Sequence, residues 1–291
     1  MTMWGAWAGA EMSPPERGKV IWVVPDWPKS SVDDNSEVKA NVFVRLLEQL
    51  QAAVPQYDHH LIRGTSDKAM RLWREGKNIC VLPILKTNER SDIGEFTAFI
   101  AVPPYRVIVK NSQVGAILAK SDDADSFKTL TTSKNMKGGL IMDRSYGEAL
   151  DRILADSPVA ERNWSLIEPQ EGWETILKMV QIGRVDYTVE MSEFVRFFNK
   201  KNPPGAGAAG SFLVALPIKE TSDVQIAYVA CNKNKWGKEI IKLLDKKMQS
   251  IALQKDYMKN LETLFQDDGL KDFKQDLQSF VQKRSEGPWK N

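Results

Sequence analysis

Residues 76–90 read GKNICVLPILKTNER. The apolar run at 78–85 is typical of a buried strand, and the polar segment after it ends in Arg90. Upstream, the sequence patterns predict strands and helices in alternation, at 19–24, 38–54, 60–63 and 68–75. This β-α-β-α-β order implies a parallel sheet with helices on its faces, because parallel strands need a crossover connection.

The pattern restarts after an extended stretch at 96–110, which Pro103 and Pro104 interrupt. Further strands are expected at 139–142, 164–167, 185–189, 212–218 and 224–231. Further helices are expected at 148–154, 173–182, 235–251, 255–265 and 270–282. We therefore predict an α/β protein with two lobes, each a mostly parallel sheet flanked by helices. Strands that cross near 103–110 and 211–225 would join the lobes.

The composition disfavours several classes of function. The chain has 291 residues, of which 42% are hydrophobic, so it can bury a substantial core in one large domain or two. Its 40 basic residues nearly balance 38 acidic ones, which gives no reason to expect a nucleic-acid partner. The sequence has only two histidines, which are adjacent, and it contains neither CxxC nor HExxH, so we predict no metal site and no cofactor.

The first 18 residues differ in character from the rest. Residues 1–10 (MTMWGAWAGA) are uncharged and end in Ala8-Gly9-Ala10, which fits a signal-peptidase site. Residues 11–18 are polar and proline-rich, as in a tether. We interpret 1–18 as a signal remnant whose start is missing, followed by the tether, which predicts a periplasmic protein. The alternative is an apolar start on a cytosolic protein.

Cys80 and Cys231 both fall in strands predicted for the first lobe. If the sheet places those strands side by side, a disulfide is possible in an oxidising compartment. Buried free thiols are the other interpretation, which we favour slightly.

Five segments together resemble the type 2 periplasmic solute-binding proteins, in the polar amino-acid-binding branch and closest to proteobacterial members without assigned ligands. They are WVVPDWPKS at 22–30, GKNICVLPILKTNER at 76–90, GGLIMDRSYGEALDRIL at 138–154, LKMVQIGRVDYTVEM at 177–191 and AYVACNKNKWGKEIIKLLDKKMQSI at 227–251. The resemblance covers about residues 19–265. It implies a two-lobed periplasmic-binding-protein type 2 fold with two hinge strands. Lobe one would comprise 19–107 plus 223–291, and lobe two 108–222.

The same resemblance implies a monomer that binds a small polar solute, an amino acid or a related carboxylate, for a membrane transporter or a sensor. In the family, the arginine of the T-x-E-R segment binds the α-carboxylate of the ligand, so Arg90 is the first candidate. A guanidinium suits that task because its planar fork gives two charge-assisted hydrogen bonds. Thr87 can add a hydroxyl group, and the backbone carbonyl of Leu85 can accept a proton from an ammonium group.

The segment Arg144-Ser145-Tyr146-Gly147 stands at a predicted helix N-terminus, where free N–H groups and the helix dipole favour an anion. We therefore expect Arg144, Ser145 and Tyr146 to contact the ligand. A plain helix cap at Ser145 is an equally good interpretation of the segment alone.

Glu190 follows a predicted strand at the point where many amino-acid-binding proteins hold the ligand's ammonium group, whereas Asp186 matches a structural aspartate of the family. Asp26 and Trp27 end the first strand, where relatives place an aromatic ring against the ligand side chain. The corresponding alternatives are an exposed acid and a packing tryptophan.

Three segments depart from the family pattern, at 76–80, 96–99 and 205–210, so another small anion or zwitterion is an alternative ligand. A dehydratase-type enzyme on the same scaffold is a second alternative, with Glu190 or Glu171 as a general acid. An interaction or sensory module with an inert cleft is a third. We predict a binding protein without catalysis.

Overall fold

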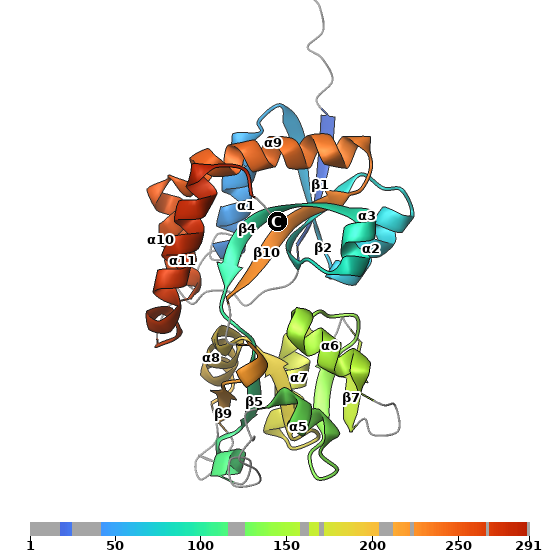
Figure 1. Ribbon diagram of the computed structural model, residues 1–291, viewed down its shortest axis with the longest axis vertical. Coiled ribbons are helices and arrows are strands. Elements are labelled where there is room, and N and C mark those ends of the chain that lie inside the picture. Colours follow the sequence, from blue (N-terminus) through green and yellow to red (C-terminus); the bar gives the residue numbers. More distant parts are fainter. Residues whose placement is uncertain are drawn as a thin grey trace, which may run out of the picture.

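The computed structural model describes residues 18–24, 42–115, 126–157, 163–168, 172–203, 212–221, 224–265 and 268–289. They form two lobes, each built on a five-stranded sheet flanked by helices (Figure 1). The predicted α/β architecture of two lobes is therefore confirmed. Among the helices described, none combines the length and the apolar composition that a membrane crossing requires.

The sheet of the first lobe has the strand order β2-β1-β3-β10-β4. These strands are β1 (Gly18–Val24), β2 (Tyr57–Arg63), β3 (Ile79–Leu85), β4 (Gly94–Val102) and β10 (Gln225–Asn232). Pairing of β1 with both β2 and β3 is parallel, as the β-α-β-α-β pattern predicts. Strand β10 returns from the second lobe and pairs antiparallel with β3 and β4.

Helices cover both faces of this sheet (Figure 1). They are α1 (Val42–Ala53), α2 (Ser66–Arg74), α3 (Asn88–Ile93), α9 (Lys235–Ala252), α10 (Lys255–Leu264) and α11 (Asp268–Glu286). Side chains alternate between the faces along each strand. Trp22 and Leu82 accordingly pack in the core under α1, α9 and α10, whereas Val23 and Val81 pack under α2.

The C-terminal helix α11 is attached to the sheet through a buried charge. The side chain of Arg284 is fully buried and donates to the backbone oxygen of Ala98 at 3.1 Å and to Thr97 Oγ1 at 2.9 Å. It also forms an ion pair with Asp245 on α9 at 2.7 Å. These bonds satisfy the guanidinium within the first lobe.

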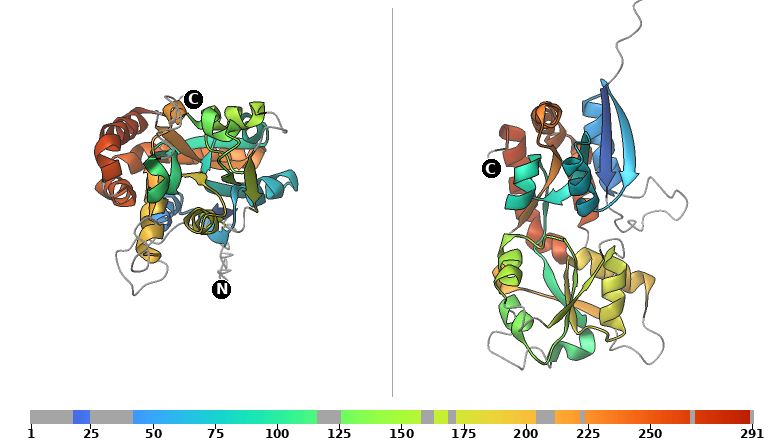
Figure 2. Two further views of the ribbon diagram at one scale, coloured as in Figure 1. Left: turned by 90° about the horizontal axis from the view of Figure 1, so that it is seen from below. Right: turned by 90° about the vertical axis from the view of Figure 1, so that its right-hand side faces the viewer.

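The sheet of the second lobe has the order β7-β6-β8-β5-β9. Its strands are β5 (Arg106–Lys110), β6 (Gly138–Ile141), β7 (Trp164–Ile167), β8 (Tyr187–Glu190) and β9 (Leu213–Leu216). Helices α7 (Gly172–Gln181) and α8 (Ser192–Lys201) cover one face, while α5 (Phe127–Thr132) and α6 (Glu148–Asp156) lie on the other (Figure 2). In each described sheet one strand is antiparallel to the other four, namely β10 in the first lobe and β5 in the second.

The chain crosses between the lobes twice. It leaves the first sheet after β4 and enters the second at β5, and it returns between β9 and β10. The return passage contains the 3-10 helix η5 (Lys219–Thr221). Thr221 Oγ1 donates to the backbone oxygen of Tyr105 at 2.9 Å, which ties the two passages together.

Three short helices, α3, α5 and α8, were not expected from the sequence. Two of them have six residues, which is too short for a helical apolar period to show. Hydroxyl groups instead mark their starts, because Thr87 Oγ1 and Ser126 Oγ accept the capping N–H groups. Residues 38–41 of the expected helix at 38–54, and the glycine-rich loop at 205–210, lie outside the described residues.

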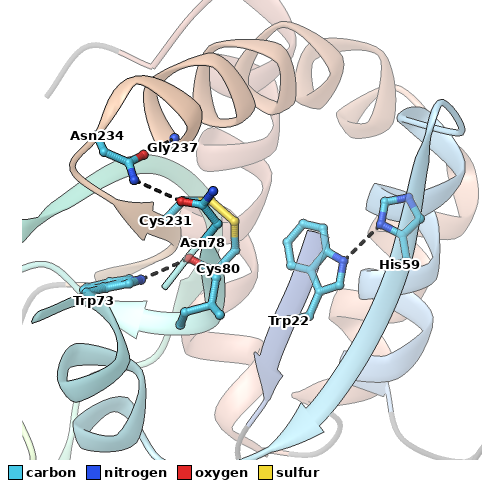
Figure 3. Close-up of a disulfide and its surroundings, with 9 residues drawn as sticks. Trp22, His59, Trp73, Asn78, Cys80, Cys231, Asn234 and Gly237 are labelled. Atoms are coloured by element: carbon cyan, nitrogen blue, oxygen red, sulfur yellow. Dashed lines mark hydrogen bonds between the residues drawn. A yellow bond between two sulfur atoms is a disulfide. The ribbon is translucent and has the colours of Figure 1, made fainter. Parts of the chain in front are cut away.

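Cys80 and Cys231 form a disulfide between β3 and β10 (Figure 3). The two residues are register partners of the antiparallel pair, and their Cα atoms are 4.1 Å apart. The slight preference for free thiols was therefore wrong. The sequence could not show that β10, which follows the whole second lobe, lies beside β3.

Removing the disulfide should lower the free energy of unfolding by about 2–4 kcal/mol, because the cross-link joins residues 151 positions apart and constrains the unfolded chain. Urea denaturation of the protein with Cys80→Ala and Cys231→Ala, against the oxidised wild type, measures the loss. Thiol titration in urea is the control, with no free thiol expected before reduction and two after it. Two thiols before reduction would contradict the disulfide.

Candidate functional site

A cavity of about 330 Å³ lies between the lobes, within the range of about 300–1,000 Å³ found for small-molecule sites. The first lobe contributes the ends of β2 and β3 and the starts of α2 and α3. The second contributes the residues after β6 and the starts of α7 and α8. Strand ends of this kind are where α/β folds place their ligands, because the loops that follow them are free to carry polar groups.

Arg90 is held in the wall of this cavity by the first turn of α3. Thr87 caps that helix by accepting the backbone N–H of Arg90 at 3.2 Å. The Arg90 side chain is only 5% exposed, and its Nη1 donates to the backbone oxygen of Leu85 at 2.8 Å. Its Nη2 lies 3.4 Å from Ser66 Oγ and 3.5 Å from the backbone oxygen of Asp143, in the opposite lobe.

The charge of Arg90 has no carboxylate partner among the described residues. Burial lowers the pKa of its guanidinium, while the more distant carboxylate of Asp151 opposes that change. The group is still a cation at neutral pH, because the ordinary pKa of arginine lies far above neutrality. The cavity wall therefore presents a buried positive charge with neutral hydrogen-bond partners.

Arg144 and Glu190 form the second charged unit beside the cavity. Arg144 Nη1 donates to Glu190 Oε2 and Nη2 donates to Oε1, both at 2.7 Å, in a bidentate ion pair. The Glu190 side chain is fully buried at the end of β8, and its Oε1 also accepts the backbone N–H of Met191 at 2.9 Å. Both oxygens of this carboxylate are thus in use within the protein.

Two tyrosines enclose the Arg144 guanidinium. Its carbon atom Cζ lies 5.4 Å from the ring centre of Tyr105 and 5.5 Å from that of Tyr146. Burial lowers the pKa of Arg144, but Glu190 and the two tyrosines outweigh that effect, so the pKa lies well above its usual value. Burial has the opposite effect on Tyr105: it raises the pKa of the phenol, and the nearby charge of Arg144 opposes this rise. Arg144 is a permanent cation whose charge Glu190 balances.

The loop at 144–147 departs from the expected helix cap. Ser145 lines the cavity, yet its Oγ donates to Asp151 Oδ2 at 2.5 Å and the cap residue of α6 is Gly147, with φ at +93°. The backbone N–H of Tyr146 donates to Asp151 Oδ1 at 2.7 Å. Burial raises the pKa of Asp151, and these two bonds oppose the rise. The alternative interpretation of Ser145 as the N-cap was therefore wrong, because its hydroxyl group and the backbone N–H of Tyr146 both bond to Asp151 and fold the loop back.

The other predicted site residues are distributed as follows. Leu85 lines the cavity, but Arg90 already uses its carbonyl. Thr87 lines a second, more polar groove of about 790 Å³, which residues of both lobes border. Tyr146 is 1% exposed, and its hydroxyl accepts the backbone N–H of Ile141 at 2.8 Å, so it supports the loop. Asp26, Trp27 and Glu171 lie outside the described residues.

Most of the cavity wall is apolar, and sequence analysis did not identify this part. Tyr105 and Phe194 are 4% and 5% exposed, and Phe194 packs edge-to-face on Trp173 with ring centres 5.1 Å apart. Helix α8 was not expected, so the place of Phe194 at its start was not visible. The Pro-Pro-Tyr sequence at 103–105 could have signalled a residue fixed at the crossing between the lobes.

Asp186 and His59 have structural partners. Asp186 Oδ2 accepts the backbone N–H of Lys137 at 2.7 Å, in keeping with the structural role expected for it. His59 Nδ1 accepts the indole N–H of Trp22 at 3.1 Å, far along β2 from the cavity (Figure 3). Within the described residues, no group of three His, Cys, Asp or Glu side chains is placed to hold a metal ion.

Comparisons with known proteins identify the fold. No family model matches the sequence, and no curated protein is similar to it. An ancestral arginine-binding protein bound to arginine matches with a TM-score of 0.62 and 15% identity, over 86% of this chain and 99% of that one.

Two further solved structures agree. A putative L-cystine ABC transporter from Listeria monocytogenes has a TM-score of 0.62 and 17% identity, over 85% and 95% of the two chains. A histidine kinase sensor domain with similarity to periplasmic binding proteins has a TM-score of 0.63 and 15% identity, over 86% and 97%. At these identities the likeness shows the fold, which is the two-lobed fold of type 2 periplasmic binding proteins.

Replacing Arg144 by methionine should lower the free energy of unfolding by about 3–5 kcal/mol, because Glu190 would remain buried without its cation. Adding Glu190→Gln should recover part of the loss. Denaturant titration measures both effects. The matched control is Arg152→Met, which breaks an exposed pair with Glu148 and should cost less than about 1 kcal/mol. Equal losses in Arg144→Met and Arg152→Met would contradict a buried, coupled pair.

Proposed function

We propose that this protein binds a small solute through its carboxylate group, in the cavity between the lobes and without catalysis. The observation that carries the proposal is Arg90, a buried guanidinium at the cavity wall with no carboxylate partner among the described residues. Burying a charge without a counter-charge is unfavourable. A ligand carboxylate supplies that counter-charge, with bidentate geometry.

The solute is an amino acid or a related carboxylate that the protein delivers to a membrane transporter or a sensor. Two structural neighbours support these alternatives, one described as a putative L-cystine ABC transporter and the other as a histidine kinase sensor domain. The disulfide supports a periplasmic or otherwise extracellular location, since such bonds persist in oxidising compartments. We propose that the protein acts there as a monomer, with lobes at 19–107 plus 223–291 and at 108–222.

The charge arrangement disfavours a dehydratase-type enzyme that uses Glu190. A general acid must carry a proton and meet the substrate. Glu190 instead receives two hydrogen bonds from Arg144 and one from Met191, and it does not line the cavity. Of the structural neighbours reported above, one is described as an arginine-binding protein and another as a putative L-cystine ABC transporter. Both observations favour binding without chemistry.

A thermal-shift screen with the twenty amino acids and small mono- and dicarboxylates tests the proposal. A ligand that binds only the native state raises the melting temperature by mass action. For each hit, we expect Arg90→Ala to weaken binding by about 2–5 kcal/mol in calorimetry, because the carboxylate loses its buried partner.

The control variant is Arg71→Ala, which removes an exposed arginine from α2 that does not line the cavity. It should bind as the wild type does, and the unliganded Arg90→Ala protein should keep a cooperative melting transition. A hit that binds the Arg90→Ala protein with unchanged affinity would remove Arg90 from the site. A screen without any shift would favour an interaction module with an inert cleft.

A further inference from the structure

The ion pair between Arg144 and Glu190 affects which carboxylate ligands the cavity can bind. An amino acid brings an ammonium group next to its carboxylate, and that group needs an acceptor of negative charge. Two buried glutamates lie beside the cavity without lining it, Glu193 and Glu190. Burial raises the pKa of Glu193, which favours its uncharged form, whereas Glu190 is fully buried and paired with Arg144. The two carboxylate oxygens of Glu190 accept three hydrogen bonds from Arg144 and the backbone of Met191. Glu190 therefore has no free oxygen with which to bind an incoming ammonium group.

The other described acids at the cavity are poorly placed for that role. Asp143 is exposed, and it is the backbone oxygen of this residue, rather than its carboxylate, that faces Arg90. Asp67 is half-exposed in the first turn of α2, where the helix dipole attracts its charge. Exposed charges contribute little to binding, because water screens them.

Positive charge dominates the described wall. Three arginines line the cavity against two aspartates: Arg63, Arg90 and Arg144 against Asp67 and Asp143. Tyr105 lines the same cavity as Arg90 and Arg144, and its hydroxyl accepts a hydrogen bond from Arg144 Nη2 at 3.3 Å. An ammonium group close to the carboxylate would lie near these cations, and like charges repel most strongly where water is excluded.

The remainder of the wall is built from apolar side chains with few polar atoms. Val81, Ile84 and Val102 face the cavity from the first lobe, and Met191 and Phe194 from the second, each with an exposed fraction of 5% or less. Such a wall gains free energy from an apolar ligand body in proportion to the area removed from water. These apolar side chains, among the described residues, offer no hydrogen-bond partner to a second charged group on the ligand.

We propose that the cavity selects monocarboxylates that carry an apolar body and lack an α-ammonium group. This inference rests on the proposed function and narrows it. Arg90 binds the single carboxylate, the apolar wall packs on the body, and Arg144 neutralises Glu190, so that Glu190 offers no ammonium subsite. Arg63 is exposed and Glu190 balances Arg144, so Arg90 is the one buried cation of the described wall without a carboxylate partner, which matches one ligand carboxylate.

The test compares matched ligand pairs on the wild-type protein by calorimetry. The pairs are 4-methylpentanoate with L-leucine and 3-phenylpropanoate with L-phenylalanine, with acetate and glutarate added. We expect each monocarboxylate to bind at least tenfold more tightly than its amino acid, and acetate and glutarate at least tenfold more weakly than 4-methylpentanoate. Binding should depend on Arg90 and not on Arg71.

The outcomes separate this inference from the proposed function. If an amino acid binds as well as its partner or better, in an Arg90-dependent way, the inference is overturned and the proposed function stands. Preference for glutarate would overturn it in the same way. If neither the monocarboxylates nor any member of the earlier screen binds, both fail.

A variant tests the role of Arg144 directly. Arg144→Gln releases Glu190 from its ion pair, so the selectivity should shift toward the amino acid of each pair by at least tenfold. An unchanged ratio in a folded variant would contradict the role assigned to Arg144. Where the variant does not fold, the wild-type comparison decides the proposal by itself.

Discussion

The bidentate ion pair between Arg144 and Glu190 sets the charge of the cavity between the lobes. Glu190 ends β8 and is the register partner of Arg106, the first residue of β5, so the pair lies where the chain enters the second sheet. Arg144 in turn contacts Tyr105, the residue just before that entry, at 3.3 Å from its hydroxyl. One interaction therefore joins the loop after β6, the end of β8 and the first passage between the lobes.

Arg90, Arg144 and Arg284 are arginines with little solvent exposure, and of these three only Arg144 and Arg284 have a carboxylate partner among the described residues. Arg144 has Glu190 and Arg284 has Asp245, each at 2.7 Å. The charges of Arg144 and Arg284 are therefore compensated inside the protein, as is usual for buried ions. Arg90 has no such carboxylate. It donates to the backbone oxygen of Leu85 at 2.8 Å, and its two other contacts are longer, at 3.4 and 3.5 Å. The contrast supports the proposal that a ligand supplies the counter-charge of Arg90, and it does so without reference to any relative.

Local patterns in the sequence predicted the lobes and the setting of Arg90, because both depend on neighbours in the chain. A buried strand followed by Thr-Asn-Glu-Arg places the arginine beside the strand end whatever the rest of the fold does. The partner of Glu190 is 46 positions away, and the partner of Cys80 is 151 positions away, across the second lobe. Such pairings depend on the order of strands in a sheet, which no local pattern contains. For the same reason, the sequence suggested an acid that was open to a ligand where the structure has an ion pair.

The fold determines where the ligand lies, and the side chains determine which ligand it is. Proteins with 15–17% identity share the two lobes with this chain, so the scaffold alone leaves the ligand open. Arg90 belongs to the first lobe, yet one of its nitrogen atoms lies 3.5 Å from the backbone oxygen of Asp143 in the second. A ligand can shift the arrangement of the lobes only if it binds one arrangement better than another. A ligand whose carboxylate is bound by Arg90 would meet that condition. Arg90 lies at the contact between the lobes, and apolar side chains from both lobes would enclose the rest of the ligand.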